Sequence, residues 1–455
     1  MIELLRSPRR LLLFLFEAAL LGFSLTAAAC IRLGLHEALV APHVRKKALL
    51  YAVVVAGAAY YTGLYDRGGV RRYAGITRRW FAATIVATPV LFVTFYFLPQ
   101  LTIGRGIFLA SLAITVTVLP TWRLAYDSVS RNVIPLRRVL VMGTGELALH
   151  IREHLTVHRD ASDQCVGLLA RDRAHVDAEA GVVGTYGDLF EVVRELEADC
   201  VVVAFRERRG TLPVEQLLEL KLRGVECLEG TDYYEHLANK VFVGDLKASQ
   251  IIFAQGYRID ATQRRLKRLF DVLIATIGLI LAAPLLLLVA VAVKLESRGP
   301  VFYRQERAGE FGKAFVILKF RSMRTDAEQA GAQFAQNNDP RVTRVGNFIR
   351  KTRLDELPQL WNVLVGEMSM VGPRPERPVF LEKLEQRIPY FKQRLYVKPG
   401  VTGHAQVRCR YGATTEDMLE KLQYDLYYIH SQSLLFDLSI LVDTVKVVVL
   451  KVGAR

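Results

Sequence analysis

The sequence predicts a membrane protein that combines α-helical and α/β parts. We expect an N-terminal four-helix transmembrane bundle (1–130), a Rossmann-like parallel α/β middle domain (135–258) and a mostly helical C-terminal domain with a re-entrant membrane helix and interfacial helices (264–455). Three observations predict this class. Four apolar stretches open the chain, strand and helix patterns then alternate, and a later apolar stretch is interrupted by Pro284.

Composition favours a membrane location and argues against nucleic acid. Hydrophobic residues make up 51% of the 455 residues and the formal net charge is +15, which suits a membrane protein with a cationic face toward anionic headgroups or phosphorylated substrates. Basic and aromatic residues are not interleaved as in single-strand binders, so we expect no nucleic-acid partner. The five cysteines are scattered without CxxC spacing, which predicts no zinc site or disulfide framework and fits a reducing cytoplasm.

The four opening stretches each approach the ~20 residues that cross a bilayer as a helix. They are Leu11–Ile31, Ala48–Tyr65, Trp80–Leu98 and Ile107–Leu124. Cations precede the first stretch, separate the second from the third, and follow the fourth: Arg6, Arg9 and Arg10, then Arg67, Arg71, Arg72, Arg78 and Arg79, then Arg131, Arg137 and Arg138. The positive-inside rule therefore places both ends of the bundle in the cytoplasm, although the cations at 45–47 count against this orientation.

The segment 135–258 alternates strand and helix character, which predicts a parallel α/β sheet. RRVLVMGTGELALHIREHL predicts a strand, a glycine turn and a helix. Its Gly143, Gly145 and Ala148 form a degenerate GxGxxA pattern that would let the backbone approach phosphate at a helix N-terminus. No carboxylate within Gln164–Leu169 closes a ribose site. The domain therefore either binds a nucleotide or keeps this fold for regulation or association.

The third unit opens with a basic run and the apolar stretch Val272–Leu295. Because proline removes a hydrogen-bond donor and clashes with the preceding turn, we expect a helix break near Ala283 and Pro284. Each arm, about 12 residues or roughly 18 Å, is too short to cross a bilayer. We therefore expect a re-entrant helix at about 270–296, with a kinked transmembrane helix as the alternative. A last apolar helix, Ser433–Val452, is interrupted by charges and is expected to lie in the membrane interface.

The most informative stretch is LDELPQLWNVLVGEMSMVGPRPE, Leu354–Glu376. It places the adjacent acids Asp355 and Glu356 between a cationic run and Arg374. Carboxylates suit a divalent metal, and guanidinium and ammonium groups bind phosphates, so this cluster predicts phosphoryl-transfer chemistry on a diphosphate. The alternative is an ordinary helix start, because acids and a proline such as Pro358 are both favoured in a first turn.

Ordered motifs from about Arg264 onward carry a family resemblance. They are KRLFDVLIATIG, GPVFYRQERAG, ILKFRSMRTDAE, DPRVTRVGNFIRKTRLDELPQLWNVL, GEMSMVGPRPE and VKPGVTGHAQV. These motifs resemble the bacterial sugar transferase family of polyprenyl-phosphate hexose-1-phosphate transferases. The whole chain is similar to the large monotopic-type members of that family. Its tail, YGATTEDMLEKLQYDLYYI with the closing GAR, resembles the subgroup associated with exopolysaccharide and PEP-CTERM systems.

The resemblance implies an enzyme at the cytoplasmic face of the bacterial inner membrane. It would transfer a sugar 1-phosphate from a UDP-sugar to undecaprenyl phosphate, release UMP, and so start an exopolysaccharide or O-antigen repeat unit. The implied course is ping-pong through a covalent aspartyl-phosphosugar intermediate. The implied partners are the donor, the lipid acceptor, the bilayer and a second copy of the chain, whereas the identity of the sugar is left open.

The resemblance also implies roles for particular residues. Asp355 would be the nucleophile, and Glu356, together with Asp355, would bind Mg²⁺. The resemblance places further cations near the substrate: Lys319, Arg321, Arg350 and Arg374. For Lys319, attraction to lipid headgroups is an alternative. Arg410 aligns with an arginine implicated in nucleotide recognition.

Two departures from the family pattern bear on these roles. Many members read GITGWAQVNGRN where this chain reads GVTGHAQVRCRY, so His404 replaces a tryptophan and Arg410 has altered neighbours. His404 suits a structural role or donation to phosphate better than catalysis. Members also often carry serine before the helix-breaking proline, where this chain has Ala283, so the bend must be stabilised in another way.

Two other functions are compatible with parts of the sequence. A membrane-anchored nucleotide-sugar dehydratase or epimerase also combines spans with a dinucleotide fold, but it needs a tyrosine with a lysine four positions on, and no tyrosine here has that spacing. A non-catalytic scaffold for polysaccharide assembly would leave the acid pair and its arginines without a purpose. The sequence therefore favours the transferase.

Overall fold

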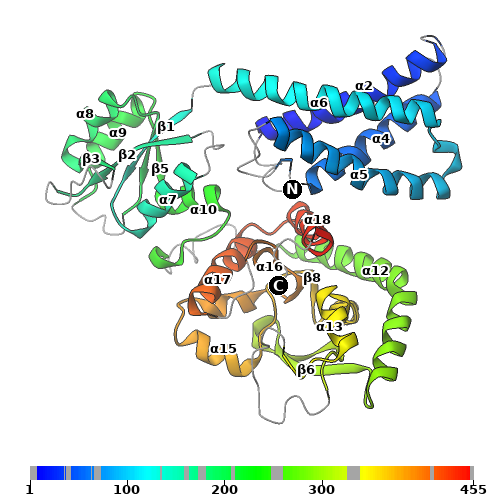
Figure 1. The fold of residues 1–455 in the computed structure, drawn as a ribbon. Helices are drawn as coiled ribbons and strands as arrows, with labels where there is room; N and C mark the ends of the chain where they lie inside the picture. Colours follow the sequence, from blue (N-terminus) through cyan, green and yellow to red (C-terminus); the bar gives the residue numbers. More distant parts are fainter. Residues whose placement is uncertain are drawn as a thin grey trace.

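The structure is a computed structural model of the chain. It describes all residues except 1–7, 35, 37–41, 63, 66–72, 134–135, 158–162, 173–180, 206–210, 247–259, 325–338, 410–413 and 451–455. An N-terminal helical bundle, a sheet domain and a C-terminal domain follow one another along the chain (Figure 1).

Four long helices form the N-terminal bundle. They are α2 (Pro8–Leu33), α4 (Pro42–Tyr61), α5 (Tyr73–Phe97) and α6 (Arg105–Val133), with the 3-10 turn η1 (Pro99–Leu101) between the last two. Their shared core includes Leu21, Tyr51, Trp80, Leu91 and Leu119, each at most 1% exposed. All four predicted helices are therefore present in the bundle.

The helices with the length and apolarity of a membrane span differ in part from those predicted. Within the described residues these are Leu11–Leu33, Arg79–Phe97, Arg105–Tyr126 and Ala261–Glu296. The second predicted span, Ala48–Tyr65, is not among them. Its helix, α4, begins at Pro42 and ends at Tyr61, so three cations occupy its first turns and the apolar part is shorter than expected. Four apolar helices together with a parallel sheet nevertheless fit a membrane α/β protein.

The middle of the chain folds into a five-stranded parallel sheet in the order β3-β2-β1-β4-β5, which follows the doubly wound order. Its strands are β1 (Arg137–Met142), β2 (Asp163–Ala170), β3 (Val182–Thr185), β4 (Cys200–Val203) and β5 (Glu226–Glu229). Its helices are α7 (Glu146–Val157), α8 (Leu189–Glu195), α9 (Val214–Leu222) and α10 (Gly230–Ala238), with 3-10 turns η3 (Tyr186–Asp188) and η4 (Val243–Asp245). The predicted parallel α/β sheet is confirmed.

Alternation along β1 explains why helices cover both faces of this sheet. Val139 and Val141 pack in one buried cluster with residues of α7 and α10, whereas Leu140 and Met142 pack in another with residues of α8 and α9. Successive side chains of a strand point to opposite faces, and a strand that is apolar at every position is buried on both. The apolar run of β1 therefore specifies the two-sided packing.

The C-terminal domain begins with the 36-residue helix α12 (Ala261–Glu296). Pro284 lies inside this helix, which runs on past it, and Figure 1 shows the helix bending part-way along. The predicted break is therefore a bend within one helix. Whether this helix re-enters the bilayer or crosses it stays a prediction.

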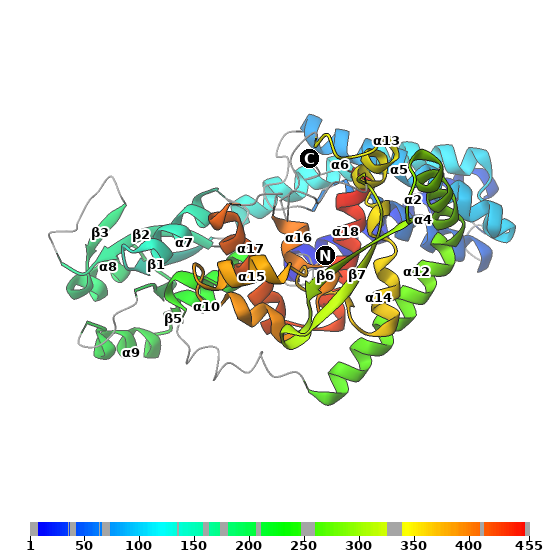
Figure 2. The ribbon, with the colours of Figure 1, turned by 90° about the horizontal axis from the view of Figure 1, so that it is seen from below.

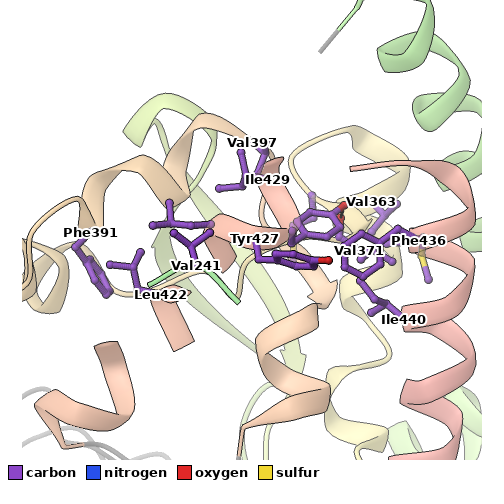
Figure 3. Packing of buried hydrophobic residues seen from close by; sticks show 14 of the residues in the cluster. Val241, Val363, Val371, Phe391, Val397, Leu422, Tyr427, Ile429, Phe436 and Ile440 are labelled. Carbon is purple, nitrogen blue, oxygen red and sulfur yellow. Dashed lines mark hydrogen bonds between the residues drawn. The ribbon is translucent and has the colours of Figure 1, made fainter. Parts of the chain in front are cut away.

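Short strands and helices complete the C-terminal domain. They are β6 (Phe302–Ala308), η6 (Glu310–Gly312), β7 (Ala314–Phe320), α13 (Arg344–Lys351), η7 (Leu354–Glu356), α14 (Gln359–Val365), β8 (Ser369–Val371), α15 (Pro378–Glu385), η8 (Phe391–Tyr396), β9 (Gly400–Thr402), α16 (His404–Arg408), α17 (Thr415–His430) and α18 (Leu434–Leu450). β6 and β7 form an antiparallel hairpin, and β8 pairs with β9 in parallel. Figure 3 shows their core, in which Val363, Val371, Phe391, Leu422 and Tyr427 are each at most 2% exposed.

The C-terminal domain contacts both the sheet domain and the N-terminal bundle. Val241 and Val243, which follow α10 of the sheet domain, are buried in the C-terminal core. Figure 2, viewed from below, shows α15 and α17 between the sheet domain and α12. On the other side, the Tyr60 hydroxyl of α4 donates to Asp443 of α18, so this last helix contacts the bundle as well as the C-terminal core.

Candidate active site

The acid pair lies where α13 gives way to α14. Thr343 caps α13, its hydroxyl accepting from the Gly346 N–H at 2.9 Å, and the helix ends in the basic residues Arg350 and Lys351. Arg353 then adopts a left-handed conformation with φ of 59°, which turns the chain sharply into η7. The turn therefore presents both carboxylates on a short rigid segment instead of within a regular helix. The alternative interpretation placed the acids in the first turn of a helix. The next α-helix, α14, begins at Gln359, three residues after Glu356.

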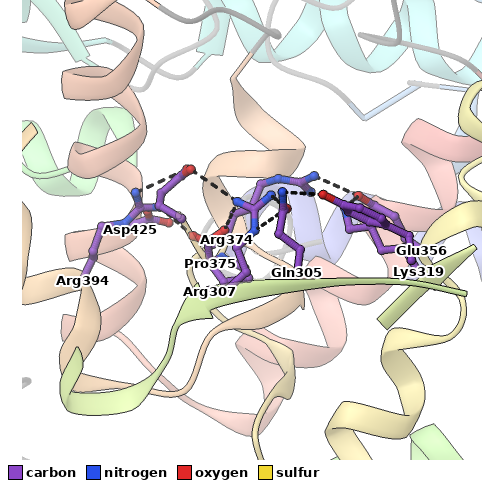
Figure 4. Close-up of polar contacts among 10 residues, drawn as sticks. Gln305, Arg307, Lys319, Glu356, Arg374, Pro375, Arg394 and Asp425 are labelled. Carbon is purple, nitrogen blue, oxygen red and sulfur yellow. Dashed lines mark hydrogen bonds and ion pairs between the residues drawn. The ribbon is translucent and has the colours of Figure 1, made fainter. Parts of the chain in front are cut away.

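Glu356 is held by cations that are distant from one another in the sequence (Figure 4). Its Oε1 accepts from Lys319 Nζ at 3.0 Å and from Arg374 Nη2 at 2.8 Å. Arg353 Nη1 lies 3.6 Å from Oε2. Lys319 comes from β7 and Arg374 from the loop after β8, so the fold brings together residues that the sequence separates by as many as 55 positions.

These cations keep the Glu356 carboxyl ionised. Burial alone would raise the pKa of its carboxyl, but Arg374, Lys319 and Arg353 hold that pKa well below its usual range. Charge-assisted hydrogen bonds favour the ionised form. Glu356 is therefore a fixed anion whose cations stay aligned.

The pKa of Asp355 is shifted in the opposite direction to that of Glu356. Burial, followed by repulsion from Glu356, raises the pKa of its carboxyl to about 6, against the lowering influence of Lys319, Arg353 and Arg350. Within the described part of the chain, this carboxylate accepts no hydrogen bond and forms no ion pair. A carboxylate without partners has its lone pairs available for a metal or for an electrophile.

Arg350 is the second group of the cluster with an uncommitted side chain. No hydrogen bond or ion pair joins its guanidinium to any described residue, although it lies close enough to lower the pKa of Asp355. Five N–H donors are therefore available next to the free carboxylate. Arginine donors bind phosphate oxygens in a bidentate manner, so this residue suits a substrate phosphate.

Arg321 contacts the end of α12, and its predicted contact with substrate stays a prediction. The residue is 5% exposed. Its Nη2 donates to Ser297 O at 2.7 Å and to Ser297 Oγ at 2.8 Å, while Nη1 donates to Arg298 O at 3.1 Å. These acceptors lie at the C-terminal end of α12. Arg321 therefore satisfies carbonyls that a helix end leaves without partners.

The acid pair fits a magnesium ion, although no group of three or more His, Cys, Asp or Glu side chains gathers anywhere in the described residues. Mg²⁺ is typically bound by one or two carboxylates, with phosphate oxygens and water completing the octahedron. Asp355 offers two free oxygens, and Glu356 Oε2 has only the distant Arg353. Two carboxylates suffice only if the substrate supplies further oxygens, as a diphosphate does.

The sequence also singled out His404 and Arg410. His404 is buried among Tyr424, Tyr427 and Phe436, and its Nε2 is 3.1 Å from Asn239 O, which indicates a structural role between domains. Arg410 lies outside the described residues. The role of this arginine in nucleotide recognition stays a prediction.

The glycine turn of the sheet domain has a packing explanation. Gly143 has φ of 130°, and a Cβ at this position would lie 2.6 Å from the Ala204 carbonyl oxygen. A side chain is therefore excluded by the neighbouring strand, without any ligand. Nucleotide binding here, and the grouping with Gly145 and Ala148, stay predictions.

Residues of β6 next to the site were missed. Tyr303, Gln305 and Arg307 alternate along the strand and are joined by hydrogen bonds: Gln305 Nε2 donates to Tyr303 Oη at 2.9 Å, and Arg307 Nη2 donates to Gln305 Oε1 at 2.7 Å. Tyr303 pairs directly with Lys319 across the hairpin. The polar positions spaced by two in FYRQERA are the signal that would have found this row.

Most matches to known proteins cover the C-terminal domain, which carries the acid pair. Residues 262–451 match the model of the family described as "Bacterial sugar transferase". The UDP-N-acetylgalactosamine-undecaprenyl-phosphate N-acetylgalactosaminephosphotransferase of Aeromonas hydrophila is 48% identical over 190 residues, 42% of this chain and 45% of that protein. A putative undecaprenyl-phosphate N-acetylgalactosaminyl 1-phosphate transferase of Bacillus subtilis is 53% identical over 148 residues, 32% of this chain and 79% of that protein.

A third relative extends beyond the C-terminal domain. The undecaprenyl-phosphate glucose phosphotransferase of Komagataeibacter xylinus is 34% identical over 324 residues, 68% of this chain and 58% of that protein. The match to the Aeromonas relative spans less than half of that protein's length. This chain belongs to the bacterial sugar transferase family. The family's members include proteins named as undecaprenyl-phosphate sugar phosphotransferases.

Proposed function

We propose that this protein transfers a sugar 1-phosphate from a UDP-sugar to undecaprenyl phosphate and releases UMP. The observation that carries this proposal is the Asp355 carboxylate, which has no partner among the described residues and lies beside a Glu356 held by Lys319 and Arg374. This arrangement lies within the segment that matches the family model. A free carboxylate surrounded by fixed cations suits attack on a negatively charged diphosphate.

The reaction would proceed in two displacements at one phosphorus. An Asp355 oxygen attacks the β-phosphorus of the donor, the bond from that phosphorus to the bridging oxygen breaks, and UMP leaves with the electron pair. The sugar phosphate is then held on Asp355 as an acyl phosphate. A phosphate oxygen of undecaprenyl phosphate attacks the same phosphorus, which breaks the acyl phosphate, releases the carboxylate and forms the lipid-linked diphosphate sugar.

The cations have separate parts in this mechanism. Arg350 and Arg374 orient the donor diphosphate for in-line attack, because guanidinium groups bind phosphate oxygens in fixed directions. Lys319 keeps Glu356 ionised and in place. A bound Mg²⁺, held by Asp355 and Glu356, would screen the negative charge of the diphosphate.

The membrane arrangement supports a lipid acceptor. α12 is apolar along most of its length and its exposed side chains include Leu281, Leu287 and Leu288, each at least 67% exposed. This helix packs against α14, which follows the acid pair directly. We infer that the reaction takes place at the cytoplasmic face of the inner membrane and starts an exopolysaccharide or O-antigen repeat unit.

The test is release of UMP by the full-length protein in detergent or nanodiscs, with Mg²⁺, undecaprenyl phosphate and a panel of UDP-sugars. The panel includes N-acetylgalactosamine and glucose donors, since both sugars occur in the names of relatives. We expect turnover with at least one donor. Asp355→Asn should lower it by at least about 1,000-fold, because an amide oxygen cannot replace the nucleophile.

Glu382→Gln is the matched control, since Glu382 is an exposed acid of α15 in the same domain. This variant should retain wild-type turnover. Wild-type protein that releases no UMP with any donor, or Asp355→Asn protein as active as the wild type, would refute the proposal.

A further inference from the structure

The loop that carries Arg374 is held through its carbonyl groups. Four consecutive carbonyls accept hydrogen bonds from outside the loop. Pro373 O accepts from Gly400 N at 2.9 Å and Glu376 O accepts from Ala308 N at 2.9 Å. Arg374 O accepts from Arg394 Nη2 at 3.2 Å and Pro375 O accepts from Arg307 Nη1 at 3.0 Å. The two central contacts, at and next to the site arginine, both come from arginine side chains.

The two prolines explain why carbonyls hold this loop. Pro373 and Pro375 lack an N–H, so two of the loop's donors are missing on either side of Arg374. Neighbouring strands therefore cannot fix the loop by ladder hydrogen bonds at these positions. The direction in which Arg374 leaves the backbone depends on which groups hold the carbonyls around it.

Arg394 is itself fixed deep in the domain. Its side chain is 3% exposed, and its Nη2, which holds Arg374 O, also donates to Asp425 Oδ2 of α17 at 2.7 Å. Its Nη1 lies 3.7 Å from Glu376 Oε1. Figure 4 shows Arg394 and Asp425 on the far side of the loop from Glu356. Arg394 therefore ties the site loop to a helix that has no atom in the acid cluster.

Arg307 is fixed in a similar way from the hairpin. Its Nε and Nη2 donate to Gln305 Oε1 at 3.1 and 2.7 Å, and its Nη1 lies 3.9 Å from Glu376 Oε2. Glu376 thus lies between the two arginines. Arg307, Arg394, Glu376 and Asp425 form a charge-balanced group behind the loop, in which Arg394 and Asp425 are buried and the other two are half-buried. Each arginine keeps donors for a carbonyl.

We propose that Arg394 and Arg307 are positioning residues of the transfer reaction, which hold the backbone of the Pro373–Glu376 loop so that the Arg374 guanidinium meets both Glu356 and the donor diphosphate. This inference rests on the proposed function. Outer groups that orient a charged ligand commonly contribute 10- to 100-fold to activity, and small displacements at a phosphoryl-transfer site are costly.

The test is a double-mutant cycle between positions 394 and 374, read as kcat/KM for UMP release. Arg394→Lys keeps the charge beside Asp425 but loses the planar fork that sets two acceptors at fixed directions. We expect it to lower kcat/KM by about 10- to 100-fold. In an Arg374→Ala background the same substitution should change kcat/KM by less than about threefold, because the group that it positions is gone.

Arg307→Lys is the second variant, and it should show the same dependence on Arg374. Arg341→Lys is the matched control, since Arg341 pairs with the buried Asp339 at 2.6 Å in the same domain. The control should retain wild-type kcat/KM. Equal losses in the presence and absence of the Arg374 side chain, for both variants, would overturn the inference. Wild-type turnover in the same assay separates that outcome from a failure of the proposed function.

Discussion

The two adjacent carboxylates of the site have opposite protonation environments. Three cations contact Glu356 and keep the pKa of its carboxyl well below the usual range in spite of its burial. Burial and the Glu356 charge raise the pKa of Asp355 to about 6. Divergent pKa values in a pair of acids indicate divided roles. This divergence supports the proposal that Glu356 organises charge and that Asp355 reacts.

The first prediction concerns pH. Because the raised pKa of Asp355 is about 6, its reactive anion is lost as the pH falls through that value, so the rate of the first half-reaction should fall on the acid side. Lys319 lowers the pKa of Asp355, so Lys319→Met should raise this pKa and move the acid limb of kcat/KM to higher pH. The measurement is UMP release between about pH 5 and 8.

Lys313→Met is the control for that shift. Lys313 is an exposed lysine at the tip of the same hairpin, six positions before Lys319. Its replacement should leave the acid limb unchanged. An acid limb that stays in place in Lys319→Met, or that moves equally in both variants, would contradict the assignment of the limb to Asp355.

At the scale of single elements, α12 depends on contacts at both of its ends. Near its start, Arg268 donates to Val363 O and Leu364 O at 2.6 and 2.7 Å, which fixes α12 to the end of α14. At its far end, Arg321 donates to the carbonyls of Ser297 and Arg298. These contacts orient the apolar helix relative to the segment that carries the acids.

The prediction at this scale separates a structural role of Arg321 from substrate binding. Arg321→Met removes several charge-assisted hydrogen bonds to a helix end, so unfolding should become easier by roughly 3 kcal/mol. The KM for the donor should stay unchanged in protein that remains folded. Thermal unfolding and initial rates on the same preparation measure both quantities.

Arg298→Met is the comparison variant, since the exposed Arg298 side chain forms no hydrogen bond or ion pair with any described residue. It should change stability by less than about 0.5 kcal/mol. A higher KM in Arg321→Met with an unchanged unfolding temperature would return Arg321 to the substrate site.

Sequence patterns predicted the helices and strands more successfully than they predicted the contacts between these elements. Apolar runs of span length predicted the bundle and α12, and the alternation of strand and helix predicted the parallel sheet. The acid pair and the cations Lys319 and Arg374 were also identified as one site. By contrast, the helix-end role of Arg321 and the support of Arg374 by Arg394 depend on contacts across 24 and 20 positions, and no local pattern encodes them.

For the whole molecule, the main feature is the joint between the sheet domain and the C-terminal domain. Asn239 has a left-handed backbone with φ of 55° and is 2% exposed. Its Oδ1 accepts from the Tyr427 hydroxyl at 3.2 Å, and its carbonyl oxygen is 3.1 Å from His404 Nε2. Two residues further on, the Val241 N–H donates to Gln423 O at 3.1 Å. The sheet domain therefore contributes to the core of the C-terminal domain.

The prediction at this scale is that both domains lose stability together when the joint is weakened. Asn239→Ala removes the side-chain oxygen that accepts from the buried Tyr427 hydroxyl, and alanine is less suited than asparagine to a left-handed backbone. Together these changes cost about 2 to 4 kcal/mol. Hydrogen exchange should speed up in β4 and in α17 alike.

Lys240→Ala is the adjacent control, because the ion pair of Lys240 with Glu420 is partly exposed. Such pairs contribute at most about 1 kcal/mol, so exchange should change little. Faster exchange confined to the sheet domain in Asn239→Ala would show that the two domains are not coupled through this joint.

The most direct test of the mechanism is intact-mass spectrometry of the protein after incubation with Mg²⁺ and an accepted UDP-sugar, without lipid acceptor. The mechanism predicts that wild-type protein gains the mass of one sugar phosphate, that undecaprenyl phosphate removes it, and that Asp355→Asn gains nothing. Wild-type protein that turns over with acceptor but never carries this added mass, or an Asp355→Asn variant that carries it, would contradict the role of Asp355 as nucleophile.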